Sequence, residues 1–255
     1  MFLEKFRIPT LLGLFVLLGG LAAGIYLTMQ NQILTTSATP ETTPKSVTIT
    51  NVEDQSATIS WQTDTPVSGF VTFASGQTQT ALDDRDEVTP TTRVTHHVTL
   101  SNLLPETIYQ FKIVSGKYTT AASEFQTAKP APPNGFEPII GSVLNGNDPL
   151  ASGIVYLQIN GDITNSSVIK SLGNFVIPLT NLTPVIGSPA KLVIISENNQ
   201  QASATFTMKD NGEPIGPLKI GQDLDLTDAL GVATDKDKNK DGVVNSFDLI
   251  KKPTD

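Results

Sequence analysis

Oxygen-bearing side chains stand at alternate positions near the end of the chain, in the stretch DKNKDGVVNSFD, residues 237 to 248. Calcium is a hard cation that takes about six to eight oxygen ligands, and this alternation directs several side-chain oxygens toward one side. Glycine at the sixth position allows a sharp turn, and the next residue can offer its backbone carbonyl. The sequence therefore predicts a Ca2+ site with the ligands Asp237, Asn239, Asp241, Val243, Asn245 and Asp248.

These six positions are positions 1, 3, 5, 7, 9 and 12 of an EF-hand-type loop, with aspartate in place of glutamate at the last. That aspartate and the continuation VNSFDLIKK resemble the dockerin repeat, in which a helix follows the loop. A complete dockerin has a second repeat, which we do not find, so segment 227–255 is interpreted as a dockerin-like calcium-binding tail. A solvated acidic tail is the alternative.

The composition excludes several classes of site. The chain has 255 residues, a formal net charge of -8 and no cysteine. Without cysteine there is no disulfide framework, no thiolate metal site and no cysteine nucleophile. The acidic balance and the lack of a basic cluster argue against nucleic acid as a partner, because phosphate binding needs a basic face.

An uncharged apolar run extends from Ile8 to Met29 and would reach roughly 33 Å as a helix, enough to cross a bilayer. A cleavable signal sequence is the alternative, but the run continues past its only cleavage-like stretch, so we interpret 8–29 as a transmembrane helix. Lys5 and Arg7 precede it, which makes 1–7 a cytoplasmic stub. The expected location is the plasma membrane, single-pass, with an extracellular C-terminal region.

Segment 30–45 is rich in Ser, Thr and Pro and is expected to be a stalk. From residue 46 to residue 128 the pattern alternates with period two, in VTITNV, ATISWQ, GFVTFAS, TRVTHHVTLSNL, TIYQFKIV and SEFQTA. Short alternating strands separated by turn residues are typical of an antiparallel β-sandwich. The expected core-facing residues include Ala57, Ile59, Trp61, Tyr109, Phe111 and Ile113.

The stretches ATISWQTDTPVSGFVTFASG and THHVTLSNLLPETIYQFKI resemble the fibronectin type III family, in the variant found at the N-terminus of purple acid phosphatases. The resemblance implies a tyrosine corner at Tyr109, whose hydroxyl would bond to nearby backbone. Glu106 stands where the family usually has glycine. Such a module is a spacer or binding unit.

A catalytic centre is not expected. The only histidines, His96 and His97, are neighbours on one strand and so point to opposite faces, which keeps them from sharing one metal ion. We expect His96 to be partly buried and His97 to be exposed. Serines without a paired histidine lack a base, and the charged run 83–87 is expected to be a solvated loop. We therefore predict that the chain is not an enzyme.

A proline-rich linker, 129–135, precedes a second all-β pattern over 136–226. Asn145-Gly146, Asn160-Gly161 and Asn211-Gly212 predict tight turns. The run IIGSVLNGNDPLASGIVYLQ with SLGNFVIPL resembles carboxypeptidase-regulatory-like and collagen-adhesin B-type repeats, which implies a prealbumin-like sandwich.

The sequence thus predicts an all-β chain with two tandem β-sandwiches between a membrane helix and an EF-hand-like, dockerin-like loop. We expect a bacterial cell-surface structural or binding protein, with a cell-surface protein or glycan as partner. Two alternatives remain open. The tail could recruit a cohesin-like partner, or the chain could be a non-catalytic subunit or remnant of a surface phosphoesterase.

Overall fold

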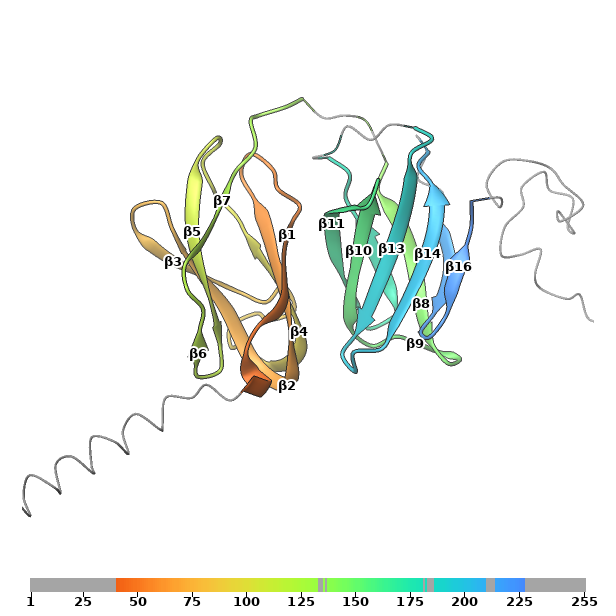
Figure 1. Ribbon diagram of the computed structural model, residues 1–255, viewed down its shortest axis with the longest axis horizontal. Coiled ribbons are helices and arrows are strands. Elements are labelled where there is room, and N and C mark those ends of the chain that lie inside the picture. The colour runs from red at the N-terminus through yellow and green to blue at the C-terminus, as the bar shows by residue number, and fades with distance from the viewer. Residues whose placement is uncertain are drawn as a thin grey trace, which may run out of the picture. The chain divides into compact units, whose positions relative to one another are not determined.

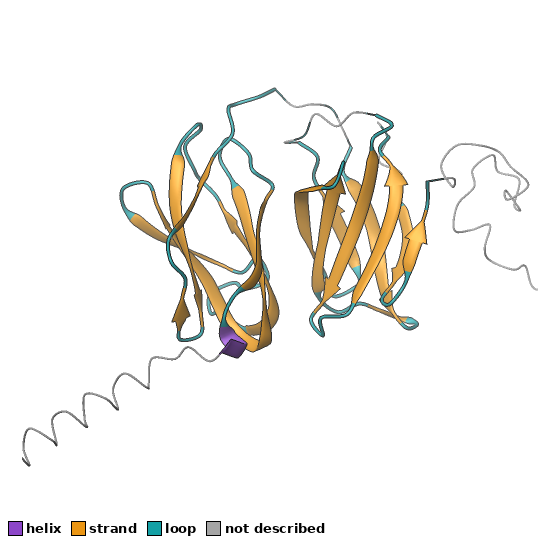
Figure 2. Ribbon diagram, viewed as in Figure 1, coloured by secondary structure: helices purple, strands orange, loops and turns teal. Residues whose placement is uncertain are grey.

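Strands make up nearly all the regular structure in the computed structural model, which describes residues 40–132, 135, 137–180, 182, 186–209 and 214–227 (Figures 1 and 2). The only helical element among them is the 3-10 turn Pro40–Thr42. The all-β prediction is therefore confirmed for the described part of the chain. Within it, no helix is long and apolar enough to cross a membrane. The predicted membrane helix, 8–29, lies outside the described residues.

The first sandwich contains the strands β1 (Lys45–Thr50), β2 (Ala57–Ala74), β3 (Thr78–Leu82), β4 (Thr92–Leu100), β5 (Ile108–Ser115), β6 (Tyr118–Thr119) and β7 (Ser123–Gln126). Strand β2 belongs to both layers. Its first part pairs with β1 and β4, and its last part pairs with β3 and β5. The register shifts between Gln62 and Val67, where the strand passes from one layer to the other.

The sequence predicted two separate strands, ATISWQ and GFVTFAS, where the structure has β2 alone, so this prediction was wrong. Pro66 lies between them, and proline usually marks a strand edge. Here Pro66 lies inside the register shift between Gln62 and Val67, where β2 is not paired with β4. Its lack of a backbone N–H therefore removes no hydrogen bond between these strands.

Apolar residues from both layers fill the first sandwich. The buried cluster is Ala57, Ile59, Trp61, Val71, Phe73, Val98, Leu100, Leu103, Tyr109, Phe111, Ile113 and Phe125. At its edge the Tyr109 hydroxyl accepts a hydrogen bond from the Leu104 backbone N–H at 2.9 Å, which confirms the predicted tyrosine corner. Glu106 adopts a φ of 48°, so this turn keeps the left-handed backbone that glycine would take more easily.

The second sandwich contains β8 (Ile139–Asn145), β9 (Asp148–Pro149), β10 (Gly153–Ile159), β11 (Asp162–Ile169), β12 (Asn174–Ile177), β13 (Pro189–Ser196), β14 (Gln201–Thr207), β15 (Ile215–Lys219) and β16 (Asp223–Asp225). One layer has the order β11-β10-β13-β14-β16, and the other has β12-β8-β15 with β9 beside β8. Asn160 and Gly161, with φ values of 54° and 96°, make the two-residue turn between β10 and β11 that the sequence predicted.

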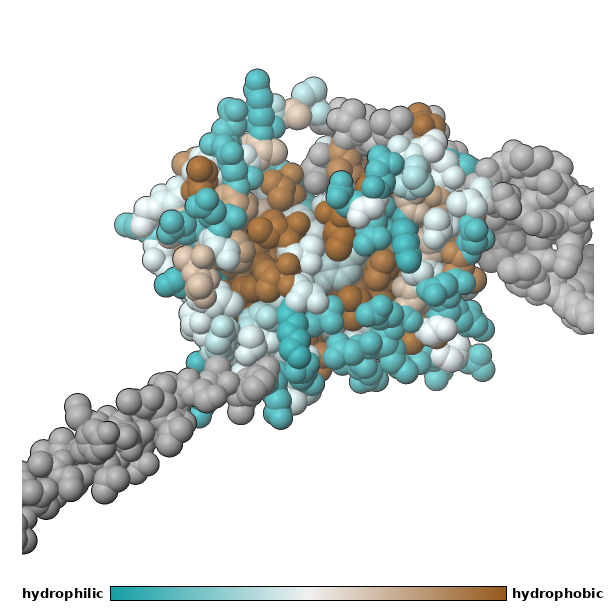
Figure 3. Space-filling view, in the orientation of Figure 1, coloured by the Kyte–Doolittle hydropathy of each residue, from teal (hydrophilic) through white to brown (hydrophobic). Residues whose placement is uncertain are grey.

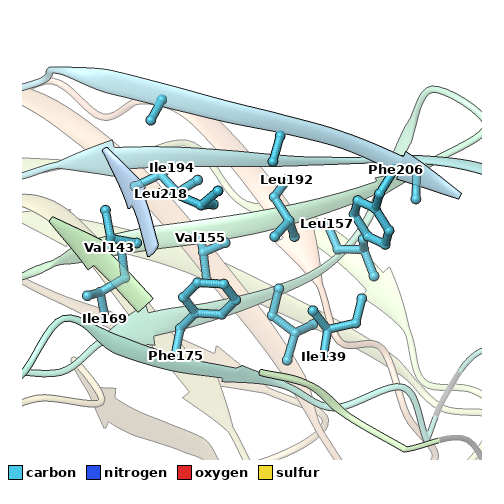
Figure 4. Packing of buried hydrophobic residues seen from close by; sticks show 14 of the residues in the cluster. Ile139, Val143, Val155, Leu157, Ile169, Phe175, Leu192, Ile194, Phe206 and Leu218 are labelled. Carbon is cyan, nitrogen blue, oxygen red and sulfur yellow. The ribbon is translucent and has the colours of Figure 1, made fainter. Parts of the chain in front are cut away.

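Side chains of the two layers meet in the core of the second sandwich. Figure 4 shows Ile139, Val143 and Phe175 from the β8 layer pointing toward Val155 and Leu157 of the other layer. Figure 3 shows apolar residues on the drawn face in several areas separated by hydrophilic residues. The largest fully buried side chains are apolar and include Trp61, Leu157 and Leu192, as the core of a β-sandwich requires.

Candidate functional site

Polar side chains cover the outer face of the β1-β2-β4 layer, yet they are buried. Thr58, Ser60 and His97 share this face, because Ser60 pairs with His97 and alternate residues of a strand point the same way. Opposite them lies the outer face of the β10 layer, with the buried apolar cluster Ile154, Tyr156 and Ile195. The Tyr156 hydroxyl donates to Ser60 Oγ at 3.0 Å. The two sandwiches thus meet face to face, and their described residues belong to one compact unit that begins at Glu41.

Arg85 is the centre of a charged cluster at one end of this contact. Its Nε and Nη2 donate to the two carboxylate oxygens of Asp83 at 2.7 and 2.8 Å, a bidentate pair. Its Nη1 donates to Glu197 Oε1 at 2.6 Å and to Ser152 Oγ at 2.9 Å, both from the second sandwich. The run 83–87 was predicted to be a solvated loop, which was wrong for Asp83, because its carboxylate is buried and paired with Arg85.

Glu197 follows β13 and bonds to the backbone of the first sandwich. Its Oε2 accepts hydrogen bonds from the N–H groups of Val94 and Thr95 at 3.0 and 3.1 Å. Its Oε1 accepts the Thr95 hydroxyl at 2.6 Å in addition to Arg85. The carboxylate of Glu197 therefore binds the backbone of strand β4 in the first sandwich.

The charges in this cluster are stabilised by their partners. Burial alone would raise the pKa of Asp83, but the hydrogen bonds and positive charge of Arg85 bring it below the usual value. Burial would likewise raise the pKa of Glu197, but hydrogen bonds from Thr95 and the charge of Arg85 lower it. Both carboxylates are thus held in the ionised form.

Asn51 and Ser166 join the other end of the contact. Asn51 Nδ2 donates to the Ser166 carbonyl at 2.9 Å, and Asn51 Oδ1 accepts the Ser166 N–H at 3.0 Å. The Asn51 backbone N–H also donates to the Thr164 carbonyl at 3.1 Å. The Asn51 side chain therefore hydrogen-bonds to the backbone N–H and C=O of Ser166 at the outer edge of β11, as a neighbouring strand would.

The structure also places a serine, a histidine and an aspartate in one row. His97 Nε2 lies 3.0 Å from Ser166 Oγ, and His97 Nδ1 lies 2.7 Å from Asp84 Oδ2. His97 was expected to be exposed, but it is only 3% exposed, because the second sandwich covers this face. The expectation that no serine is paired with a histidine was also wrong, since Ser166 comes from the other sandwich.

The burial of Ser166 opposes a nucleophilic role for it. Its side chain is 1% exposed, and its Oγ also lies 2.5 Å from Thr50 Oγ1. A nucleophile must reach a substrate carbonyl, and this oxygen is enclosed on both sides. Any motion that parts the sandwiches to admit a substrate would also separate Ser166 from His97. The row therefore acts as a hydrogen-bonded seam between the sandwiches.

His96 points the opposite way from His97, into the first core, as the alternation predicted. Its ring stacks on Trp61 with centroids 4.6 Å apart and an interplanar angle of 8°. Within the described part of the chain, both ring nitrogens lack a hydrogen-bond partner. Burial lowers the pKa of His96 to about 4, against the opposing attraction of Asp83. His96 is thus a neutral core residue.

The six predicted calcium ligands, Asp237 to Asp248, lie outside the described residues. Among the residues that are described, no three His, Asp or Glu side chains come together in a way that could hold a metal ion.

One family model matches the chain over residues 44–127, that of the "Purple acid Phosphatase, N-terminal domain". Together with the tyrosine corner and the strand pairing, this match identifies the first sandwich as fibronectin type III-like. The match ends before the second sandwich, whose resemblance to collagen-adhesin B-type repeats stays a prediction, as does that of the tail to dockerin. No curated protein matches the chain.

Several solved structures are similar to parts of the chain. The FN1–FN3 domains of chicken CNTN1 share 13% identity over 71% of this chain and 65% of that one, with a TM-score of 0.28. A two-domain fibronectin type III segment of chicken tenascin shares 15% identity over 65% and 99%, with a TM-score of 0.24. A Ca2+-stabilized adhesin of an Antarctic bacterium, described as helping it to bind ice, shares 14% identity over 68% and 50%, with a TM-score of 0.24.

Proposed function

We propose that this chain is a membrane-anchored bacterial cell-surface protein, without enzymatic activity, that displays two β-sandwiches as one unit for structural support or binding. The observation that carries the proposal is the use of the reactive side chains. His97 and Arg85, which could do chemistry in an open cleft, instead bond to Ser166 and Glu197 of the second sandwich, and Asp84 bonds to the other ring nitrogen of His97.

The membrane anchor in this proposal is the apolar run 8–29, with the N-terminus inside the cell. The test is fractionation of cells that express the full chain, followed by protease treatment from outside. We expect the chain in the membrane fraction, with residues after 30 accessible to protease. Recovery in the soluble fraction, or protection of the sandwiches in intact cells, would contradict the proposal.

The calcium-binding tail in this proposal rests on the order of oxygen ligands around Asp241. Extracellular calcium modules typically have dissociation constants of roughly 10⁻⁴–10⁻³ M, so such a site would be filled outside the cell and would act in folding rather than signalling. We expect one-site binding by calorimetric titration, lost in Asp241→Ala and kept in the control Asp235→Ala. The absence of binding heat at millimolar calcium would contradict the proposed calcium site.

The tail is also the part of the chain that a cohesin-like partner would bind. Capture of an envelope protein by the wild-type chain but not by Asp241→Ala, in the presence of calcium, would favour docking over display alone. A phosphoesterase assay on the full chain tests the remaining alternative, and turnover that depends on Ser166 or His97 would contradict a non-enzymatic role.

A further inference from the structure

Two edge strands lie at the contact between the sandwiches. Among the described strands, β4 pairs only with β2, and β11 pairs only with β10, so each has one edge without a neighbouring strand. Such an edge presents backbone N–H and C=O groups to which a strand of another chain can bond. Each edge therefore stays open to a further strand unless these groups have other partners.

Side chains occupy the outward edge of β4 in place of a strand. Three N–H groups of this edge donate to carboxylates: Thr95 to Glu197 at 3.1 Å, His97 to Asp83 at 2.9 Å and Thr99 to Asp84 at 2.8 Å. Two of its carbonyls accept hydrogen bonds, that of Thr95 from the Arg85 guanidinium and that of His97 from the Asp84 N–H. Carboxylate oxygens thus take the positions that the carbonyls of a neighbouring strand would take.

Asn51 closes the edge of β11 in a similar way. Its backbone N–H donates to the Thr164 carbonyl, and its side-chain amide bonds to both backbone groups of Ser166. Asn51 belongs to the first sandwich, whereas Glu197, which bonds to β4, belongs to the second. Each sandwich therefore supplies a side chain that closes an edge strand of the other.

Strand β4 would be a good template for a further strand if its edge were open. Its sequence, TRVTHHVTL, contains no Gly or Pro, is rich in β-branched residues and has Arg93 as its one permanently charged residue. Carboxylates outnumber guanidinium groups around this edge, so two copies that approach each other by it are repelled. The side chains at the edge thus oppose a further strand both by occupying its bonding groups and by their charge.

We propose that Asp83, Asp84, Arg85 and Glu197 at β4, and Asn51 at β11, close these edges against a strand of a second copy of this chain. We call them the edge-capping side chains. The contact between the sandwiches then does more than join them, since it keeps copies of the protein from pairing edge to edge. This inference goes beyond the proposed function and does not depend on where the protein resides.

The first test opens the edge of β4. Asp84→Ala removes the acceptor of the Thr99 N–H, whereas the control Asp148→Ala removes an exposed aspartate of the second sandwich. The full chain is purified in detergent, and sedimentation velocity is measured over a range of protein concentrations. We expect Asp84→Ala to form larger species as the concentration rises, beyond any association of the wild type or the control. Equal sedimentation of the three proteins at every concentration would overturn the proposal.

A second substitution separates strand pairing from loss of the fold. Proline has no N–H and is tolerated on the open side of an edge strand, so Thr99→Pro blocks pairing even without the side chain of Asp84. We expect the double variant, Asp84→Ala with Thr99→Pro, to sediment as the wild type does. Association caused by unfolding would persist or increase when proline is added, and that result would contradict the inference.

Amide hydrogen exchange at Thr99 measures the same edge locally. In dilute solution we expect exchange to be about tenfold or more faster in Asp84→Ala than in the wild type, because hydrogen bonds to charged groups are the strong ones. Exchange at Thr99 should then slow as the concentration rises and the copies pair. Fast exchange that does not change with concentration would show that no strand is added at this edge.

The edge of β11 is tested independently by Asn51→Gly. Asn51 and Asn102 have φ values of 49° and 58°, so glycine fits the backbone at both positions. The control Asn102→Gly changes an exposed residue of the turn after β4. We expect association that grows with concentration in Asn51→Gly and not in Asn102→Gly. The same sedimentation of both variants would contradict the closing of β11 by Asn51.

Discussion

Acid should weaken the first sandwich through the buried ring of His96. The ring is fully buried against Trp61, and burial lowers its pKa to about 4. In the unfolded chain a histidine has a pKa near 6.5, so below that pH the unfolded state binds a proton that the folded state excludes. Stability is then full above about pH 6.5, falls as the pH is lowered and levels off below about 4.

The size of this effect follows from the two pKa values. Each pH unit between them costs about 1.4 kcal/mol, so from pH 7.5 to pH 5 the free energy of unfolding should fall by about 2 kcal/mol. The assay is urea unfolding of the full chain at both pH values, followed by the fluorescence of Trp61. This residue is the only tryptophan in the sequence and reports on the first core.

Two variants identify the group that titrates. His96→Phe keeps an aromatic ring on Trp61 but cannot be protonated, so its stability should change little between the two pH values, whatever its absolute stability. His97→Gln keeps His96 and should retain the wild-type loss. Equal stability of the wild type at pH 7.5 and pH 5, or the same loss in His96→Phe, would refute the reasoning.

Three further substitutions test the packing of the first sandwich by urea unfolding. Tyr109→Phe removes the oxygen that accepts the Leu104 N–H and should cost about 1 kcal/mol, so an unchanged midpoint would deny the tyrosine corner any energetic role. Glu106→Gly relieves a φ of 48° and should stabilise by roughly 0.5 kcal/mol, whereas a loss would show that the turn is unstrained. Gly69→Ala would place its Cβ 2.7 Å from the Trp61 ring and should cost about 1–3 kcal/mol, so a neutral result would mean that the core has room there.

The core of the first sandwich was predictable from the sequence because a strand buries alternate residues. Ala57, Ile59 and Trp61 on one strand, and Tyr109 and Phe111 on another, were assigned to the core, and all five are buried. The alternation of apolar and polar residues along one strand shows which side chains face the core, even when the partner strand is not known. The tyrosine corner was predictable for another reason, since it came with the family resemblance.

The contact between the sandwiches was not predictable in the same way. Alternation assigns Thr58, Ser60 and His97 to the outer face, but it does not say what lies on that face. Arg85 and Glu197 are separated by 112 positions, so nothing in the local pattern connects them. Only the fold brings their charges together.

One signal for a covered outer face was present in the second sandwich. In GIVYLQI, residues 153–159, apolar side chains stand at consecutive positions, and Ile154, Val155, Tyr156 and Leu157 are all buried. A strand with both faces apolar is buried on both faces. The run therefore indicated a neighbour beyond the core of its own sandwich, although it did not identify that neighbour.

The two faces of the contact differ in how they tolerate water, and this matters while the protein is being made. The face of the first sandwich bears hydroxyls and an imidazole, whereas that of the second bears Ile154, Tyr156 and Ile195. Chains are synthesised from the N-terminus and domains generally fold in that order. The first sandwich, whose contact face is polar, is thus folded before the second. The apolar, aggregation-prone face of the second sandwich forms only when the first sandwich is already present to bury it.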